Sequence, residues 1–198
     1  MVSRRSWLGL ATTLLASAVV RPADAGQEVV ERSIGPADAP VKIIEYASLT
    51  CPHCANFHKE ILPKIKSTYV DTGKVRLTFR DFPLDQLALK AAIVAHCAGE
   101  ERYFRFLDAL FASQDTWRRA KDPIVSIKQL ARVGGLPEAE IDACLADTVM
   151  EEAVLKMSID GQQQFGVNST PTFIINGKAQ TGIRDFDDFA KRIDAALR

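Results

Sequence analysis

Residues 41–57 read VKIIEYASLTCPHCANF, an apolar run followed by two cysteines that are separated by two residues. The run from Val41 to Ala47 lacks a clean alternation of polar and apolar residues, which predicts a central strand covered on both faces. A helix is expected from Pro52, because the first helical turn does not need the missing N–H. Cys51 would then lie at a helix N-terminus, where the dipole favours a thiolate. Beside a second thiol, Cys54, such a thiolate can make, break or transfer a disulfide.

Two nearby side chains bear on this chemistry. His53 lies between the cysteines, where it would supply a hydrogen-bond donor or a positive charge near Cys51, or would simply be a solvated helix residue. Glu45 is a carboxylate within the apolar strand. It either reaches solvent at a sheet edge or is a buried acid beneath the site, able to exchange a proton with Cys54. A dithiol whose reduced form is favoured gives up its disulfide readily and oxidises other proteins.

These residues carry a family resemblance. The CPHC motif at 51–54, Glu45 six residues before it, and TPTF at 170–173 resemble DsbA-type thiol:disulfide oxidoreductases of the thioredoxin superfamily. The resemblance covers nearly all of the chain after residue 26. It implies an α/β thioredoxin fold with a helical insertion, about residues 83–166, between its βαβ and ββα halves. It also implies that Cys51 is an exposed nucleophile, that Cys54 resolves the mixed disulfide, and that Glu45 moves protons for it.

Thr170 and Pro171 form the second fixed point of the thioredoxin pattern. X-Pro bonds are cis in only about 5–6% of cases, but the pattern implies a cis bond here, with an ordinary strand-initiating proline as the alternative. A cis bond would bring this loop against the cysteines and expose backbone at residue 170 for pairing with a substrate strand. Many strong oxidants of the family have Val before this proline. Thr170 instead matches a subset of relatives and the disulfide isomerases.

Cys97 and Cys144 lie on helices of the expected insertion. They are either free, buried small hydrophobes or a disulfide, which two nearby thiols would form in an oxidising compartment. Some alphaproteobacterial relatives resemble this chain in having a second disulfide in the helical part, and the bridge is slightly favoured.

A structural zinc corner is the alternative to the redox site, since Cys51, Cys54 and His58 have the spacing C-x2-C-x3-H. Zinc prefers four ligands and the other cysteines stand apart, so no metal and no cofactor are expected. His58 and His96 have no placement like that of His53, and we expect ordinary surface or half-buried histidines there.

The first 25 residues are typical of an export signal. Arg4 and Arg5 precede an apolar run, 7–20, that is too short to span a bilayer, and an Ala-Asp-Ala cleavage site ends at residue 25. An uncleaved anchor is the alternative, and the paired arginines also resemble a twin-arginine signal. Export to the periplasm would place the cysteines in an oxidising compartment.

The remaining pattern supports one domain, residues 26–198. Strands are expected near 29–34 and at 75–80, 172–175 and 178–181, with a hairpin turn at Asn176-Gly177. Pro63 is expected to kink the first helix. Five helical patterns follow between residues 82 and 165, and Asp185 is expected to cap the last helix. With residues 1–25 removed, 22 basic residues face 24 acidic ones, which gives no indication of a nucleic-acid partner.

The sequence therefore favours a protein that introduces disulfides into reduced, exported proteins and is reoxidised by a DsbB-like, quinone-coupled membrane protein, as the resemblance implies. A reductase or isomerase of the same compartment is the second hypothesis, and a chaperone or metal carrier on the same fold is the third. A monomer is expected, because no dimerisation segment precedes Val41.

Overall fold

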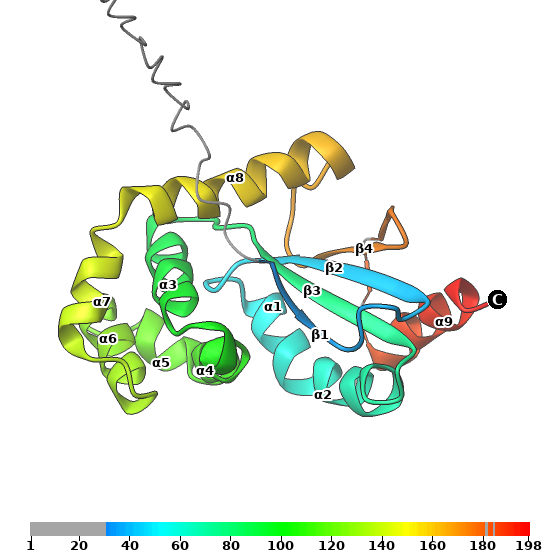
Figure 1. The fold of residues 1–198 in the computed structure, drawn as a ribbon, viewed down its shortest axis with the longest axis horizontal. Coiled ribbons are helices and arrows are strands. Elements are labelled where there is room, and N and C mark those ends of the chain that lie inside the picture. Colours follow the sequence, from blue (N-terminus) through cyan, green and yellow to red (C-terminus); the bar gives the residue numbers. More distant parts are fainter. Residues whose placement is uncertain (1–30, 181, 184) are drawn as a thin grey trace, which may run out of the picture.

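The structure, a computed structural model, describes residues 31–180, 182–183 and 185–198. It is a mixed α/β fold in which a five-stranded sheet lies beside a group of helices (Figure 1). The predicted signal at 1–25 lies outside the described residues. The strands are β1 (Arg32–Ile34), β2 (Val41–Ala47), β3 (Val75–Asp81), β4 (Thr172–Ile175) and β5 (Lys178–Gln180).

Strand β2 is central, as predicted, because the order across the sheet is β1-β3-β2-β4-β5. It pairs parallel with β3 and antiparallel with β4. Val41 and Ile43 pack in one apolar cluster with the first helix, whereas Tyr46 packs with Phe165 in another. Covering on both faces explains why this strand has no polar alternation.

The first helical stretch comprises α1 (Pro52–Asn56), η1 (Phe57–Ile61), α2 (Leu62–Ile65) and η2 (Lys66–Val70), where η marks π-helical hydrogen bonding. The disturbance expected at Pro63 is a change of hydrogen-bond pattern, since this residue lies in the short α2 between the two π-helical segments. A proline cannot donate the regular helical bond, and π-segments accommodate such interruptions. The predicted stripe at every fourth residue is buried: Phe57, Ile61, Ile65 and Tyr69.

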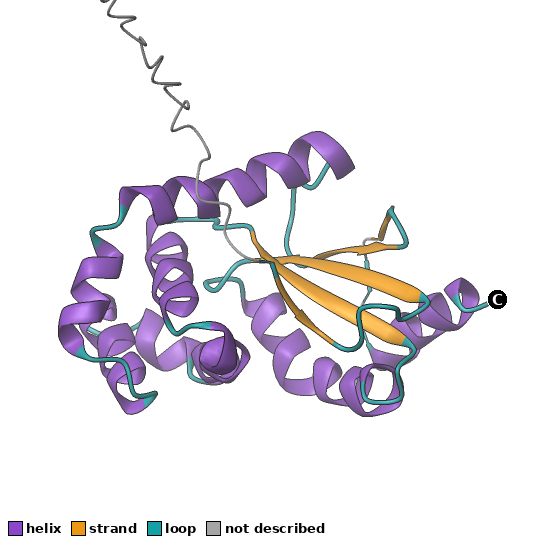
Figure 2. Cartoon of the chain, in the orientation of Figure 1, coloured by secondary structure: helices purple, strands orange, loops and turns teal. Residues whose placement is uncertain are grey.

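The predicted helical insertion is confirmed between β3 and β4. Figure 2 shows most of these helices gathered beside one end of the strands, with the last of them extending from this group along the sheet. They are α3 (Gln86–Cys97), α4 (Glu100–Ala112), α5 (Gln114–Arg118), α6 (Pro123–Val133), α7 (Glu138–Leu145) and α8 (Thr148–Phe165). Helix α5 was not among the predicted elements. The insertion has an apolar core of its own that includes Leu107, Leu110 and Trp117 and that continues to Phe79 of the sheet.

Helix α8 lies close to the sheet because of Gly161. A Cβ at this position would come within 2.6 Å of the Tyr46 ring, so a larger residue would push the helix away from β2. The helix ends as predicted at Gly166, which has a left-handed backbone (φ 67°). After the β4–β5 turn, where Asn176 and Gly177 both have positive φ, α9 (Phe186–Ala196) begins at the Asp185 cap and packs on the first helical stretch.

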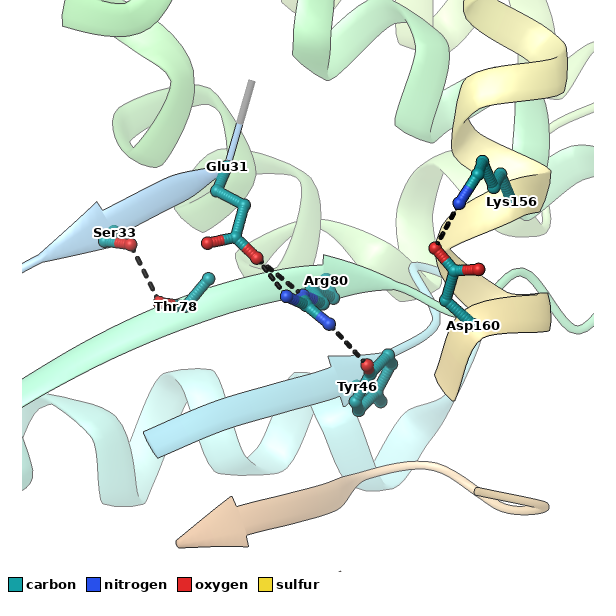
Figure 3. A network of polar contacts seen from close by, with 7 residues as sticks. All are labelled: Glu31, Ser33, Tyr46, Thr78, Arg80, Lys156 and Asp160. Atoms are coloured by element: carbon teal, nitrogen blue, oxygen red, sulfur yellow. Dashed lines mark hydrogen bonds and ion pairs between the residues drawn. The ribbon is translucent and has the colours of Figure 1, made fainter. Parts of the chain in front are cut away.

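The free end of β1 is tied to the sheet by Arg80. Its guanidinium group donates to Glu31 on one side and, at 2.8 Å, to the Tyr46 hydroxyl on the other (Figure 3). Ser33 and Thr78 hydrogen-bond across the same strand pair. Within the described part of the chain, no helix combines the length and the apolar character that crossing a membrane requires.

Candidate active site

The two cysteines of the CPHC motif lie where β2 leads into α1. Cys51 is the N-cap residue, with an extended backbone (φ −79°, ψ 121°), and Pro52 occupies the first turn. Cys51 is only 5% exposed, so the expectation of an exposed nucleophile is wrong, because the residue belongs to the apolar cluster that the sheet shares with the helical insertion. Cys54 is fully buried, and both are free thiols here.

The pKa values of the two sulfurs are shifted in opposite directions. A hydrogen bond from the Cys54 thiol is the largest influence on Cys51, and it outweighs burial to lower the pKa of Cys51 from 9.0 to about 5. The nearby Thr170 side chain and the backbone amides of residues 53 and 54 act in the same direction. Burial, followed by the hydrogen bond to Cys51 and the charges of Cys51 and Glu45, raises the pKa of Cys54 far above its ordinary value. One sulfur is therefore a stable thiolate at neutral pH and the other is held as a thiol.

The Thr170–Pro171 peptide bond is cis. It places the Thr170 carbonyl oxygen 3.4 Å from Cys51 Sγ, a distance at which the sulfur can donate a hydrogen bond when it carries its proton. The Thr170 hydroxyl is buried and has no hydrogen-bond partner among the described residues. The two fixed points found in the sequence, 119 residues apart, thus meet at the reactive sulfur.

His53 and Pro52 lie on the exposed side of the helix start. The backbone N–H of His53 contributes to the low pKa of Cys51. The role proposed for the imidazole as a tuner of the site stays a prediction.

The strand carboxylate Glu45 is fully buried, which rules out the alternative of an edge carboxylate in contact with solvent. Its strand neighbours in register are Phe79 and Phe173. Both of its oxygens lie 3.2 Å from Nε2 of His58. The expectation of an ordinary surface or half-buried residue is therefore wrong for His58, and also for His96, which is buried against Asp81 at 2.7 Å. Each histidine is held inside by a strand carboxylate.

The active-site loop is fastened by α5. Gln114 Nε2 donates to the carbonyl oxygens of Leu49 (2.8 Å) and Cys51 (2.9 Å). Arg118 donates to the Thr50 carbonyl oxygen at 3.0 Å. Sequence reasoning missed Gln114 and His58. For His58 a signal was present, since it follows Cys54 by four residues on the same helix and so lies on the side of that sulfur. For Gln114 the sequence contained no signal, because its hydrogen-bond partners are backbone carbonyl groups.

Cys97 of α3 and Cys144 of α7 are joined by a disulfide, with their Cα atoms 6.3 Å apart. The geometry does not support the zinc alternative. In the part of the chain that the structure describes, no group of three or more Cys, His, Asp or Glu side chains is arranged to hold a metal ion, and His58 is turned to Glu45.

Comparisons with known proteins agree with this geometry. A family model described as thioredoxin matches residues 27–195. The solved structure of α-DsbA1 from Wolbachia pipientis is 34% identical, with a TM-score of 0.77, over 85% of this chain and 91% of that one.

Curated relatives are also similar. A Rickettsia felis protein named "Putative protein-disulfide oxidoreductase" is 33% identical over 79% of this chain, but the match spans only 56% of that protein's own length. "Disulfide bond formation protein D" of Bacillus subtilis is 26% identical over 90% of this chain and 80% of that protein.

Proposed function

Because this chain belongs to the thioredoxin family, with DsbA proteins among its relatives, we propose that it is a thiol:disulfide oxidoreductase that introduces disulfides into reduced proteins. The observation that carries the proposal is the difference between the two sulfurs: the pKa of Cys51 is lowered to about 5, and that of Cys54 is strongly raised. A well-stabilised thiolate at Cys51 favours the reduced dithiol, and a protein with a favoured reduced form is an oxidant.

The reaction starts from the Cys51–Cys54 disulfide. A substrate thiolate attacks Cys51 Sγ, the bond between the two sulfurs breaks, and its electron pair passes to Cys54, which takes up a proton. The second substrate thiol, after losing its proton, attacks the substrate sulfur of the mixed disulfide and releases Cys51 as a thiolate. The substrate has then lost two electrons and gained a disulfide, and the protein holds two reduced cysteines.

The surroundings of Cys51 fit this sequence of steps. Thr170 and Pro171 lie against the sulfur and provide backbone with which an extended substrate can pair. We propose that residues 1–25 export the domain 26–198 to the periplasm, that its substrates are reduced exported proteins, and that a DsbB-like, quinone-coupled membrane protein reoxidises it.

The test is the reduction potential, measured by equilibrium with glutathione. Two other members of the superfamily mark the ends of the scale, DsbA at about −120 mV and thioredoxin at about −270 mV. We expect a value near the DsbA end, together with oxidation of a reduced two-cysteine peptide. A potential near that of thioredoxin would reject the proposal.

A reductase or isomerase is the second candidate, and Thr170 before the cis proline is the observation that favours it, as many strong oxidants have Val there. An insulin-reduction assay beside refolding of a scrambled disulfide substrate separates the two functions. Reductase or isomerase activity that exceeds peptide oxidation would support this second candidate.

A further inference from the structure

Glu45 and His58 form a buried acid–base pair next to the cysteines. Their side chains are 1% and 2% exposed, and Nε2 of the ring lies 3.2 Å from both carboxylate oxygens. The charge of Glu45 acts on both Cys54 and His58. Cys54 and His58 are themselves about one helical turn apart. Carboxylate, ring and resolving sulfur therefore form one interacting group.

The other ring nitrogen faces outward. Nδ1 of His58 is buried and has no hydrogen-bond partner in the described part of the chain, but it lies 3.7 Å from Oδ1 of Asp108, whose side chain is 52% exposed. His58 and Asp108 both line a surface pocket of about 530 Å³. The other charged groups that line the pocket are Lys59, Lys66 and Asp71. The imidazole thus separates the buried carboxylate from a pocket at the protein surface.

Aromatic side chains fix the ring in this orientation. Phe111 of α4 stacks on it with a centroid distance of 4.0 Å and an interplanar angle of 25°. Phe79 of β3 and Phe57 meet it edge to face at 5.8 and 5.7 Å. Because these apolar groups hold the ring, Nε2 stays directed at Glu45 and Nδ1 at Asp108.

We propose that His58 is a positioning residue that supplies, through Glu45, the proton that Cys54 needs when the disulfide opens. This rests on the proposed function. As the substrate thiolate bonds to Cys51 Sγ and the electron pair passes to Cys54, the Nε2 proton moves to Glu45 and the carboxyl proton moves to Cys54 Sγ. A solvent proton then restores the charged ring beside Asp108, so the step consumes one proton in all.

The ring is suited to this task at neutral pH. Burial lowers its pKa, but the charge of Glu45, the polar contacts with Asp108 and Glu45, and the charge of Asp108 outweigh burial and raise the pKa of His58 to about 9. The ring is therefore charged at pH 7 and holds a proton ready for Glu45.

The decisive experiment measures the rate at which glutathione opens the oxidised protein, expressed per glutathione thiolate, from pH 6 to pH 10.5. The wild-type rate should fall above about pH 9, where His58 loses its proton. In His58→Gln this fall should vanish, and the rate at pH 7 should be about tenfold lower than in the wild type. This loss is smaller than the usual contribution of a general acid, because Glu45 remains in place.

His96→Gln is the matched control, because His96 is also buried against a strand carboxylate. It should keep the wild-type profile. A profile of His58→Gln that still bends near pH 9, or that His96→Gln reproduces, overturns the proposal.

A surface variant guards against loss of folding. Asp108→Asn removes one of the charges that raise the pKa of His58, so the bend should move to lower pH, and an unmoved bend overturns the proposal even if His58→Gln does not fold. The two proposals also fail differently: a wild-type protein that cannot oxidise a reduced peptide refutes the proposed function, whereas normal oxidation with identical profiles refutes only the role of His58.

Discussion

The molecule contains two buried carboxylate–histidine pairs on neighbouring strands, and they differ in what surrounds them. Glu45 of β2 pairs with His58, and Asp81 of β3 pairs with His96. The first pair acts electrostatically on Cys54 through the charge of Glu45, and its His58 borders a surface pocket. In the second pair, the His96 ring lies 5.0 Å from the Tyr103 ring. The guanidinium group of Arg32 lies over the Tyr103 ring, 5.5 Å from its centroid.

The second pair has a structural setting. His96 is followed directly by Cys97, whose disulfide to Cys144 joins α3 to α7. Burial, and then the charge of Asp81, raises the pKa of Tyr103 well above its ordinary value, so this hydroxyl keeps its proton. The same two side-chain types thus lie beside a structural disulfide in one place and interact with the cysteine of the proposed redox site in the other. On the proposed role of His58, the neighbours of a buried acid–histidine pair, more than the pair itself, decide its function.

The contrast between the two acid–histidine pairs has a functional meaning only if the cysteines carry out the proposed reaction. Cys51→Ser removes the attacked sulfur, and we expect peptide oxidation to fall by at least about a thousandfold, because a serine oxygen cannot form the mixed disulfide. A peptide-oxidation assay measures this, with folding checked by circular dichroism. Retained activity would favour the chaperone or carrier hypothesis, and neither acid–histidine pair would then have chemistry to serve.

The second prediction concerns stability of the two redox forms. The pKa of Cys51 in the folded protein, about 5, lies below its ordinary 9.0, so the unfolded chain binds more protons between these values. The stability contributed by the thiolate is complete above pH 9 and is lost as pH falls through 5. At about 1.36 kcal/mol per pKa unit, the reduced form should gain on the order of 5 kcal/mol relative to the oxidised form across this window.

The contribution of His58 to stability changes with pH in the opposite direction to that of Cys51. Its pKa in the folded protein, about 9, lies above its ordinary 6.5, so its contribution is complete below pH 6.5 and is lost as pH rises through 9. Urea unfolding of both forms from pH 5 to pH 9 should show the oxidised protein weakening while the gap to the reduced protein widens. A gap that does not change with pH would remove the basis for an oxidising function.

The third prediction separates the two pairs directly. Asp81→Ala leaves His96 buried without its partner, and we expect a loss of about 3 kcal/mol in the free energy of unfolding. Glu45→Ala should destabilise the protein comparably and should also slow opening of the disulfide by glutathione. If Asp81→Ala slows opening as strongly as Glu45→Ala, after both are shown to be folded, the functional distinction between the pairs is wrong.

Much of this architecture could be predicted because it depends on local patterns. The mainly apolar strand at 41–47, the stripe of every fourth residue after Pro52, and the Asn176-Gly177 turn each follow from short-range rules that the structure obeys. The cysteine motif and the TPTF segment gave the fold class because a distant contact is built into the family pattern.

The errors concern side chains whose environment is set by distant strands. A histidine within a helix has the same sequence signature whether it faces solvent or a buried carboxylate, and His58 and His96 meet their partners across 13 and 15 residues through the sheet. Helix α5 has only five residues, too few for a periodic pattern. Its contact with the active-site loop is made to backbone oxygens, which carry no sequence signal.

The last prediction tests this missed contact and should have the smallest effect. Gln114→Leu removes the two hydrogen bonds to Leu49 and Cys51 while keeping the apolar volume, and the buried carbonyl oxygens lose their donor. We expect a loss of about 1–2 kcal/mol in the free energy of unfolding, together with a higher pKa of Cys51, because the loop that presents its sulfur to Thr170 is no longer held.

Thiolate absorbance in the far ultraviolet, followed against pH in the reduced protein, measures the Cys51 titration. The Asp81–His96 region has no contact with Gln114 in the hydrogen bonds of the described residues. Asp81→Ala therefore serves as the control, destabilising the protein more while leaving the titration in place. An unchanged titration in Gln114→Leu would mean that α5 supports the fold near Cys51 without setting the acidity of its sulfur, and the low pKa would then rest on Cys54, Thr170 and the helix amides alone.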